Sequence, residues 1–322
     1  MKGVHFTVIK RYISALLCFA LMFALCSCSI VGNGNSAVAT VNGEEISASV
    51  YRYFLSNLKS QIGDAETVDG RPASEYASEK ALEAAVQLYV TAQKAQELGV
   101  EFTQDMQKQL DTQISDLKTQ AGSQEKYLES LEQYGLDEQT YTLLLKYTLI
   151  QGVVTEKVQS EYTIEQINDF YNNDMVNVQQ ILLKTTDDNN QPLSDSEIAD
   201  KKALAEELLE RINNGENFSD LKAQYNEDLA NTELGYMVSE YSNFVEPFIK
   251  ASMKLEVGQV SDIVESSYGY HIIKRYNHVD NSEMFTSAQT DILSCMFQRD
   301  VQLWTQAATV EYNDDVISSV EY

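Results

Sequence analysis

The sequence is poor in histidine, proline, cysteine and tryptophan, with 3 His, 3 Pro, 4 Cys and 1 Trp among 322 residues. So few histidines argue against a metal site built from imidazoles, and so few cysteines argue against a disulfide scaffold or an all-cysteine zinc site. Basic residues are also scarce, at 23 against 49 acidic residues, which gives a formal net charge of −26. Because phosphate binding depends on Lys and Arg, this balance argues against a nucleic-acid partner.

Hydrophobic residues are plentiful, at 43%, and aromatic residues account for 10%. This content excludes a disordered acidic chain, because there is enough apolar surface to bury. The length allows one large domain or two of ordinary size, each with its own core.

The first residues have the character of an export signal. Lys2, Lys10 and Arg11 precede an apolar run over residues 13–25. The run has the length of a signal-peptide core and is too short to span a bilayer comfortably. An ordinary signal peptide or an uncleaved anchor would share these features.

The end of the apolar run favours a lipoprotein. Its Leu-Cys-Ser-Cys sequence resembles a bacterial lipobox, in which Cys28 is the expected lipid-bearing residue and Cys26 is the alternative. We therefore expect a signal peptide over 1–27, followed by the lipidated cysteine and a flexible tether over 28–36.

Residues 37–175 predict a β-hairpin followed by helices. Asn42-Gly43 within 37–47 is a strong type I′ turn signal between two short alternating segments. In the helix at 103–121, Thr103 is the expected N-cap, and the apolar face is formed by Met106, Leu110, Ile114, Leu117 and Ala121. One further helix is predicted to begin near residue 47. The others are predicted at 74–98, 123–133, 137–162 and 163–173.

Composition changes near residue 175, after which strands and helices alternate. We expect strands at 178–183, 233–238, 262–265 and 270–276, and helices at 194–214, 218–225 and 246–254. This order predicts a mixed α/β domain over 176–278.

The last segment, 279–322, contains an amphipathic helix at about 286–306 and a short strand at 308–312. Both need partners, and the middle domain is already complete. We therefore expect the segment to return to the first domain, with its helix on the N-terminal helices and its strand beside residues 37–41. The predicted fold class is α+β: a split all-α domain with a small β-hairpin, and an inserted mixed α/β domain.

Six motifs follow one another in the middle domain. They are Val-Gln-Gln-Ile-Leu (178–182), Gly-Glu-Asn-Phe-Ser-Asp-Leu (215–221), Tyr-Asn-Glu-Asp (225–228), Glu-Leu-Gly-Tyr (233–236), Phe-Val-Glu-Pro-Phe (244–248) with Leu255 and Gly-Gln-Val-Ser (258–261), and Tyr-Gly-Tyr-His-Ile-Ile (268–273). In this order they resemble a parvulin-type peptidyl-prolyl isomerase domain. The whole chain is similar to the extracytoplasmic foldase lipoproteins of Gram-positive bacteria. Its opening Val-Asn-Gly-Glu-Glu-Ile also resembles that of the SurA-like periplasmic chaperones.

This resemblance implies a lipid-anchored foldase on the extracytoplasmic face of the membrane, with a helical chaperone domain and an inserted isomerase domain. Its partners would be unfolded secreted proteins, whose X–Pro bonds exchange slowly over a barrier of ~18–20 kcal/mol. Isomerisation needs a pocket for the proline ring and groups that favour the twisted amide, so no cofactor or metal is expected. The sequence leaves a monomer and a homodimer open.

The resemblance also assigns roles to residues. The proline pocket would be lined by three apolar side chains: Leu234, Phe244 and Phe248. His271 matches the family's second histidine, Asp228 matches an acid or thiol near the substrate carbonyl, and Ser266 matches a small hydroxyl residue near the pocket. Taken singly, each is an ordinary core, strand, loop or turn residue.

Two departures from the family pattern bear on the catalytic rate. Gln180 stands where the family has its first histidine, and an amide cannot reproduce an imidazole pair with His271. The stretch 228–233 is also shorter than usual and has Asn231-Thr232 in place of Gly-Gly. We therefore expect a weak isomerase.

Two other function classes were weighed against the isomerase. The first is a non-catalytic holdase, in which the parvulin-like domain is a binding or structural module. The second is a solute-binding lipoprotein, which would need a doubly wound α/β pattern that the sequence lacks.

Overall fold

The structure is a computed structural model that describes residues 36–63, 66–187, 191–230, 233–279 and 281–320. The expected signal peptide and Cys28 lie outside these residues. Contacts divide the chain into two compact units. Unit 1 comprises Met1–Gln61, Ala77–Lys157 and Ala307–Tyr322, and unit 2 comprises Ile62–Tyr76 and Val158–Gln306.

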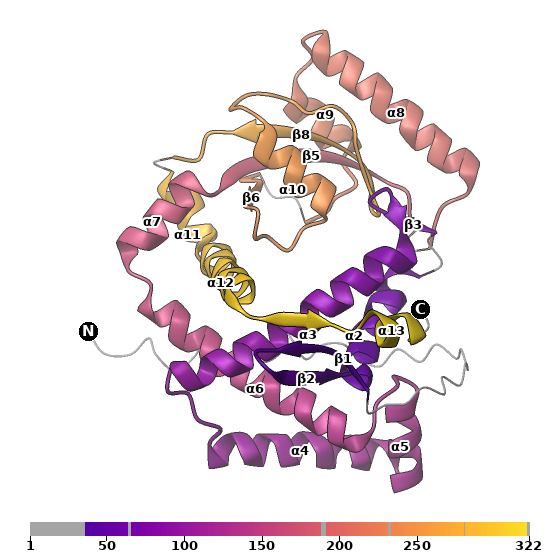
Figure 1. Cartoon of the computed structure of the whole chain (residues 1–322). Helices are drawn as coiled ribbons and strands as arrows, with labels where there is room; N and C mark the ends of the chain where they lie inside the picture. Colours follow the sequence, from indigo (N-terminus) through magenta and orange to yellow (C-terminus); the bar gives the residue numbers. More distant parts are fainter. Residues whose placement is uncertain (1–35, 64–65, 188–190, 231–232, 280, 321–322) are drawn as a thin grey trace. The chain divides into compact units, whose positions relative to one another are not determined.

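A small antiparallel sheet joins the two ends of unit 1. Its strands are β1 (Ala37–Val41), β2 (Glu44–Ser47) and β9 (Val310–Tyr312), in the order β2-β1-β9. Asn42 and Gly43 both have positive φ, at 51° and 86°, as a type I′ turn requires. Figure 1 shows β9 beside the hairpin, which confirms the predicted pairing of the last strand with the first.

Helices make up the rest of unit 1: α2 (Ala48–Ile62), α3 (Ala73–Glu97), α4 (Gln104–Ala121), α5 (Gln124–Glu132), α6 (Glu138–Glu161) and α13 (Asp314–Ser319), of which α2, α3 and α6 extend across its boundaries. Thr103 caps α4 as predicted, because its hydroxyl accepts a hydrogen bond of 3.2 Å from the Met106 amide. Met106 and Leu110 of the predicted face are buried, and the rest of that face is half-buried. Only α13 was not expected from the sequence.

Unit 2 is built on a four-stranded antiparallel sheet. Its strands are β5 (Val176–Lys184), β6 (Tyr236–Val238), β7 (Val264–Ser266) and β8 (Gly269–Tyr276), in the order β6-β5-β8-β7. Helices α8 (Asp195–Asn213) and α9 (Phe218–Tyr225) cover one face, and α10 (Glu246–Lys254) covers the other (Figure 1). The mixed α/β arrangement predicted for this part of the chain is confirmed.

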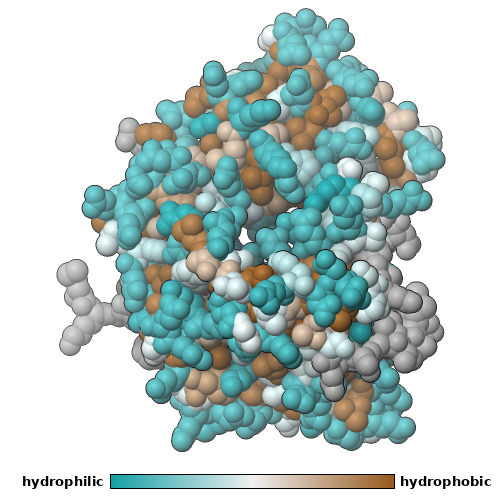
Figure 2. Space-filling model, viewed as in Figure 1, coloured by the Kyte–Doolittle hydropathy of each residue, from teal (hydrophilic) through white to brown (hydrophobic). Residues whose placement is uncertain are grey.

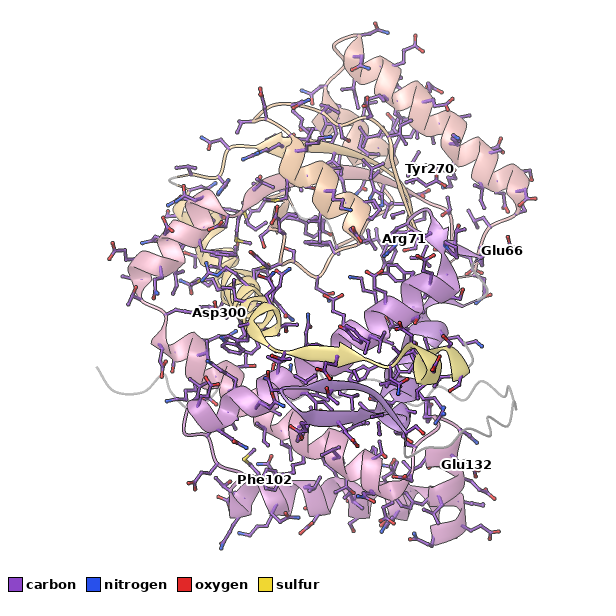
Figure 3. The ribbon with its side chains drawn as sticks, viewed as in Figure 1. Glu66, Arg71, Phe102, Glu132, Tyr270 and Asp300 are labelled. Atoms are coloured by element: carbon purple, nitrogen blue, oxygen red, sulfur yellow. The ribbon has the colours of Figure 1, made fainter. Side chains whose placement is uncertain are left out.

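The side chains of β5 and β8 alternate between two apolar cores. Ile181 and Ile272 belong to the core beneath α8 and α9, whose other members include Leu183, Ala205, Leu208, Phe218, Leu221 and Tyr270 (labelled in Figure 3). Val178 and Ile273 belong to the core beneath α10, together with Val176, Val238, Phe248 and Leu255. Because alternate residues of a strand face opposite sides, the hydrophobic pattern determines which residues lie under α10.

A third apolar core joins α7 (Ile164–Asn173), α11 (Ser282–Ser287) and α12 (Gln289–Ala307). Its buried members include Phe170, Tyr171, Met284, Ile292, Cys295 and Met296. The Asp300 carboxylate of α12 (labelled in Figure 3) also accepts a 2.7 Å hydrogen bond from the Tyr162 hydroxyl. The helix predicted at 286–306 thus packs on α7, and its expected return to the first domain stays a prediction.

The contact units do not coincide with the expected domains. The segment Val158–Gln306, which contains nearly all of α12, groups with unit 2. The residues from Ala307 onward group with unit 1. The domain boundaries at residues 175, 176, 278 and 279 therefore stay a prediction.

A two-stranded hairpin, β3 (Thr67–Val68) and β4 (Arg71–Pro72), was not predicted and belongs to unit 2. The Arg71 guanidinium lies 3.9 Å from the carboxylate of Glu246, in the first turn of α10. Strands of two residues carry too little alternation to be recognised in a sequence.

Hydrophilic residues dominate the face of the molecule seen in Figure 2, with hydrophobic residues scattered among them. None of the helices in the described part of the chain is both long enough and apolar enough to cross a membrane.

Candidate active site

Strand alternation brings Gln180 and His271 to the face of the sheet that lies under α10. Gln180 is two residues from Val178 on β5, and His271 is two residues from Ile273 on β8. In the register of the two strands Gln180 pairs with Ile273, so its side chain is a diagonal neighbour of His271. Both side chains are buried, with exposed fractions of 6% and 3%.

Asp228 follows α9 and is tied to the same part of the sheet by the residues before it. The Asn226 carboxamide oxygen accepts hydrogen bonds from the Leu182 amide at 2.9 Å and from the Asp228 amide at 3.2 Å. The Glu227 amide donates to the Leu182 carbonyl at 2.9 Å. This turn places the carboxylate of Asp228 beside Gln180.

The four polar residues expected from the family pattern form one chain of hydrogen bonds. Gln180 Nε2 donates to Asp228 Oδ2 at 2.7 Å, and Gln180 Oε1 lies 2.6 Å from His271 Nδ1. On the other side of the ring, His271 Nε2 lies 2.6 Å from the Ser266 hydroxyl.

The chemistry of the atoms fixes the direction of this chain. A carboxylate only accepts, so the Gln180 amide nitrogen faces Asp228 and its oxygen faces the ring. An amide oxygen cannot donate, so His271 carries its proton on Nδ1, and Nε2 accepts from the Ser266 hydroxyl. Every hydrogen bond in the chain is thus donated toward Asp228.

Burial determines the charge state of the ring. It lowers the pKa of His271 to about 4, although the negative charge of Asp228 opposes the shift. The imidazole is therefore neutral near pH 7. A base this weak is poorly suited to activating Ser266 as a nucleophile, so the arrangement favours orientation over covalent chemistry.

An aromatic wall stands beside the polar chain. The ring centroid of Phe248 lies 5.5 Å from that of His271 and 5.3 Å from that of Phe244. Phe248 is 2% exposed and Phe244 is 37% exposed, so the outer ring is accessible to a ligand and the inner one supports it. Phe244 and Phe248 thus lie beside the hydrogen-bonded chain, which is the arrangement expected of a pocket for a proline ring.

Leu234, the third residue expected in the pocket, packs against the core of α7, α11 and α12. The structure thus brings Phe244 and Phe248 together, and the contact of Leu234 with a proline ring stays a prediction.

The sequence analysis missed Tyr236. Its hydroxyl donates to Asp228 Oδ2 at 2.9 Å, and its ring centroid lies 5.3 Å from that of Phe244. Burial and the hydrogen bond to Asp228 raise the pKa of Tyr236, so the phenol stays protonated. The available signal was the tyrosine at the end of the Glu-Leu-Gly-Tyr motif.

Throughout the described ranges, no three His, Cys, Asp or Glu side chains come close enough to hold a metal ion.

Two family models match the chain. One, described as a PPIC-type PPIASE domain, matches residues 162–278, and the other, described as a SurA-like N-terminal domain, matches residues 6–155. The first range contains the hydrogen-bonded chain and the aromatic wall.

Curated relatives are named Foldase protein PrsA. That of Clostridium botulinum (strain Langeland) is 26% identical over 299 residues, covering 82% of this chain and 83% of the relative. That of Clostridium perfringens (strain ATCC 13124) is 24% identical over 340 residues, covering 95% and 96%. The crystal structure of PrsA from Bacillus anthracis is 23% identical and covers 70% of this chain and 96% of that one, with a TM-score of 0.33. These sequence matches show that the chain is a homologue of the PrsA foldases, with a SurA-like N-terminal domain and a parvulin-type PPIase domain.

Proposed function

We propose that this protein is an extracytoplasmic foldase that binds unfolded secreted proteins and catalyses cis–trans isomerisation of their X–Pro bonds. The observation that carries the proposal is the contact between Phe248 and His271, which joins the accessible ring of Phe244, through Phe248, to the chain from Ser266 to Asp228. The expected domain organisation and the lipid on Cys28 belong to the same proposal.

The proposed mechanism requires no covalent step. The proline ring packs on the accessible ring of Phe244, which the buried ring of Phe248 supports. The amide loses its resonance as it twists, and this changes the charge on the carbonyl oxygen. Polar groups that are already fixed in place favour that state without reorganising, and the buried, mutually hydrogen-bonded side chains of Gln180 and His271 meet this condition.

Protease-coupled isomerisation of a proline-containing peptide by the purified protein tests the proposal. We expect acceleration above the uncatalysed rate, and a loss of most of it in Phe244→Ala, which removes an accessible ring. Leu303→Ala is the matched control, because Leu303 is 53% exposed on α12 and belongs to no pocket described above. A wild-type protein that gives only the uncatalysed rate would contradict the isomerase function.

A non-catalytic holdase is the second candidate, and the presence of Gln180 at the family's histidine position favours it. Suppression of client aggregation distinguishes the two functions when it is measured on the same samples. Suppression without isomerase activity would identify the parvulin-type domain as a binding or structural module.

A further inference from the structure

Tyr236 makes a contact that Phe at this position could not make. Its hydroxyl donates to the same oxygen, Asp228 Oδ2, that accepts from Gln180, at 2.9 Å and 2.7 Å respectively. The other carboxylate oxygen accepts from the Ala230 amide at 3.0 Å. Asp228 is therefore held by three donors, one of which comes from the family's aromatic position.

The same side chain belongs to the aromatic wall. The Tyr236 ring meets the Phe244 ring edge-on at 5.3 Å, and Phe244 continues to Phe248. Since Phe248 contacts His271, the side chains form a closed ring of contacts: Tyr236, Phe244, Phe248, His271, Gln180 and Asp228. Tyr236 is the member that connects the apolar half of this ring to the carboxylate.

The connection matters because the Gln180 carboxamide is shared between Asp228 and His271, to which its two ends are hydrogen-bonded. The Tyr236 ring is held by β6 and by Phe244, and its hydroxyl meets the same carboxylate oxygen from the aromatic side. The phenol therefore gives Asp228 Oδ2 a second fixed donor, independent of the polar chain to His271.

We propose that Tyr236 is a positioning residue that aims the Asp228 carboxylate at the proline pocket and offsets the replacement of the family's first histidine by Gln180. The inference rests on the proposed isomerase function and adds a residue to its site. The high pKa of Tyr236 supports it, because the hydroxyl remains a donor throughout the range in which isomerases are assayed.

Tyr236→Phe is the direct test, because it keeps the ring and removes only the hydroxyl. Exchange rates measured by NMR over a range of proline-peptide concentrations separate kcat from KM. We expect kcat to fall about fivefold, the equivalent of one hydrogen bond, with KM changed less than twofold. Tyr241→Phe is the matched control, since the Tyr241 ring packs near Phe170, outside the closed ring of contacts, and its kcat should equal that of wild type.

A double variant tests the compensation itself. In a Gln180→His background the imidazole can both accept from His271 and donate to Asp228, so removing the Tyr236 hydroxyl should cost less there than in the native background. Tyr236→Phe with wild-type kcat would overturn the positioning role, and equal losses in the two backgrounds would overturn the compensation. An inactive wild-type protein would instead overturn the isomerase function on which both rest.

Discussion

At the scale of single residues, the site depends on a histidine whose charge is suppressed. His271 is enclosed by Gln180, Ser266 and Phe248, and each of its ring nitrogens already has a hydrogen-bond partner. In the neutral state one nitrogen donates and the other accepts, which suits Gln180 Oε1 and the Ser266 hydroxyl. A second proton would place an uncompensated charge in a buried site. Because burial disfavours the charged ring, the pKa of His271 is lowered.

The pH dependence of stability follows from this shift. The pKa of His271 falls from 6.5 to about 4 on folding, so the unfolded chain binds more protons between these values. The contribution of His271 to the free energy of unfolding is complete above about pH 6.5. It is lost as the pH falls to about 4, which lowers the free energy of unfolding by about 3 kcal/mol. Urea unfolding followed by the fluorescence of Trp304, the single tryptophan, measures it.

His271→Gln serves as the comparison, because it keeps a donor and an acceptor and removes the titration. His278 also has a pKa lowered by burial, so the variant should keep part of the acid sensitivity. The difference between the two proteins isolates His271. Identical pH slopes would mean that its pKa is not depressed in the folded chain.

At the scale of elements, the turn from β7 to β8 positions two site residues at once. It carries Ser266 as the last residue of β7, and His271 follows as the third residue of β8. Gly269 allows the turn, since its φ is +136° and an added Cβ would lie 2.1 Å from the Leu183 carbonyl oxygen. That oxygen belongs to β5 and cannot move without disturbing the sheet.

Gly269→Ala should therefore destabilise unit 2 beyond the cost of its backbone angle. Gly258→Ala is the matched control, because Gly258 also has positive φ, at +88°, but an added Cβ would meet nothing within 4 Å. We expect roughly 1–2 kcal/mol for the control and several kcal/mol for Gly269→Ala, measured by urea unfolding. Equal losses would show that the strand adapts to the side chain.

Sequence reasoning succeeded where the signal is local. Asn42-Gly43 predicts its turn and Thr103 its cap, because each acts on residues within a few positions of itself. The alternation along β5 predicts which residues share a face. For the polar site residues, the order of the motifs indicated the positions. The structure connects all four by hydrogen bonds: Ser266, His271, Gln180 and Asp228.

The remaining features depend on contacts across the fold. Tyr236 reaches Asp228 only because β6 pairs with β5 in a particular register, and Leu234 packs against the core of α7, α11 and α12. A hydroxyl in a sequence shows neither which acceptor it meets nor at what distance.

At the scale of the whole molecule, membrane attachment distinguishes Cys28 from Cys26, which lies two residues before it. If Cys28 carries the lipid and the signal peptide is removed from the variant, Cys28→Ser should release the protein into the soluble fraction of cells, because no acyl chain is left to insert into the bilayer. Cys26→Ser should leave it in the membrane fraction. Fractionation and blotting measure both variants. The reverse pattern would assign the lipid to Cys26.

The last strand joins the two ends of the chain. The Asn42 amide donates to the Thr309 carbonyl at 2.8 Å, the Thr309 amide donates to the Asn42 side chain at 2.9 Å, and the Asn313 amide donates to the Val38 carbonyl at 2.8 Å. Val38 and Val41 are fully buried beneath this strand pair. The stability of unit 1 therefore depends on residues far away in the sequence.

A chain ending after Ala308 should lose more than about 3 kcal/mol of stability in unit 1, since the three hydrogen bonds above and the β1–β9 ladder are lost and the edge of β1 is exposed. A chain ending after Asn313 keeps β9 and removes α13, so it separates the two contributions. Hydrogen exchange of the α2 and α3 amides reports on unit 1, and Trp304 fluorescence reports on unit 2. Because the removed residues belong to unit 1, we expect the unfolding midpoint of unit 2, which contains the hydrogen-bonded site residues, to move little. A parallel loss in both units would show that the chain unfolds as a single cooperative structure.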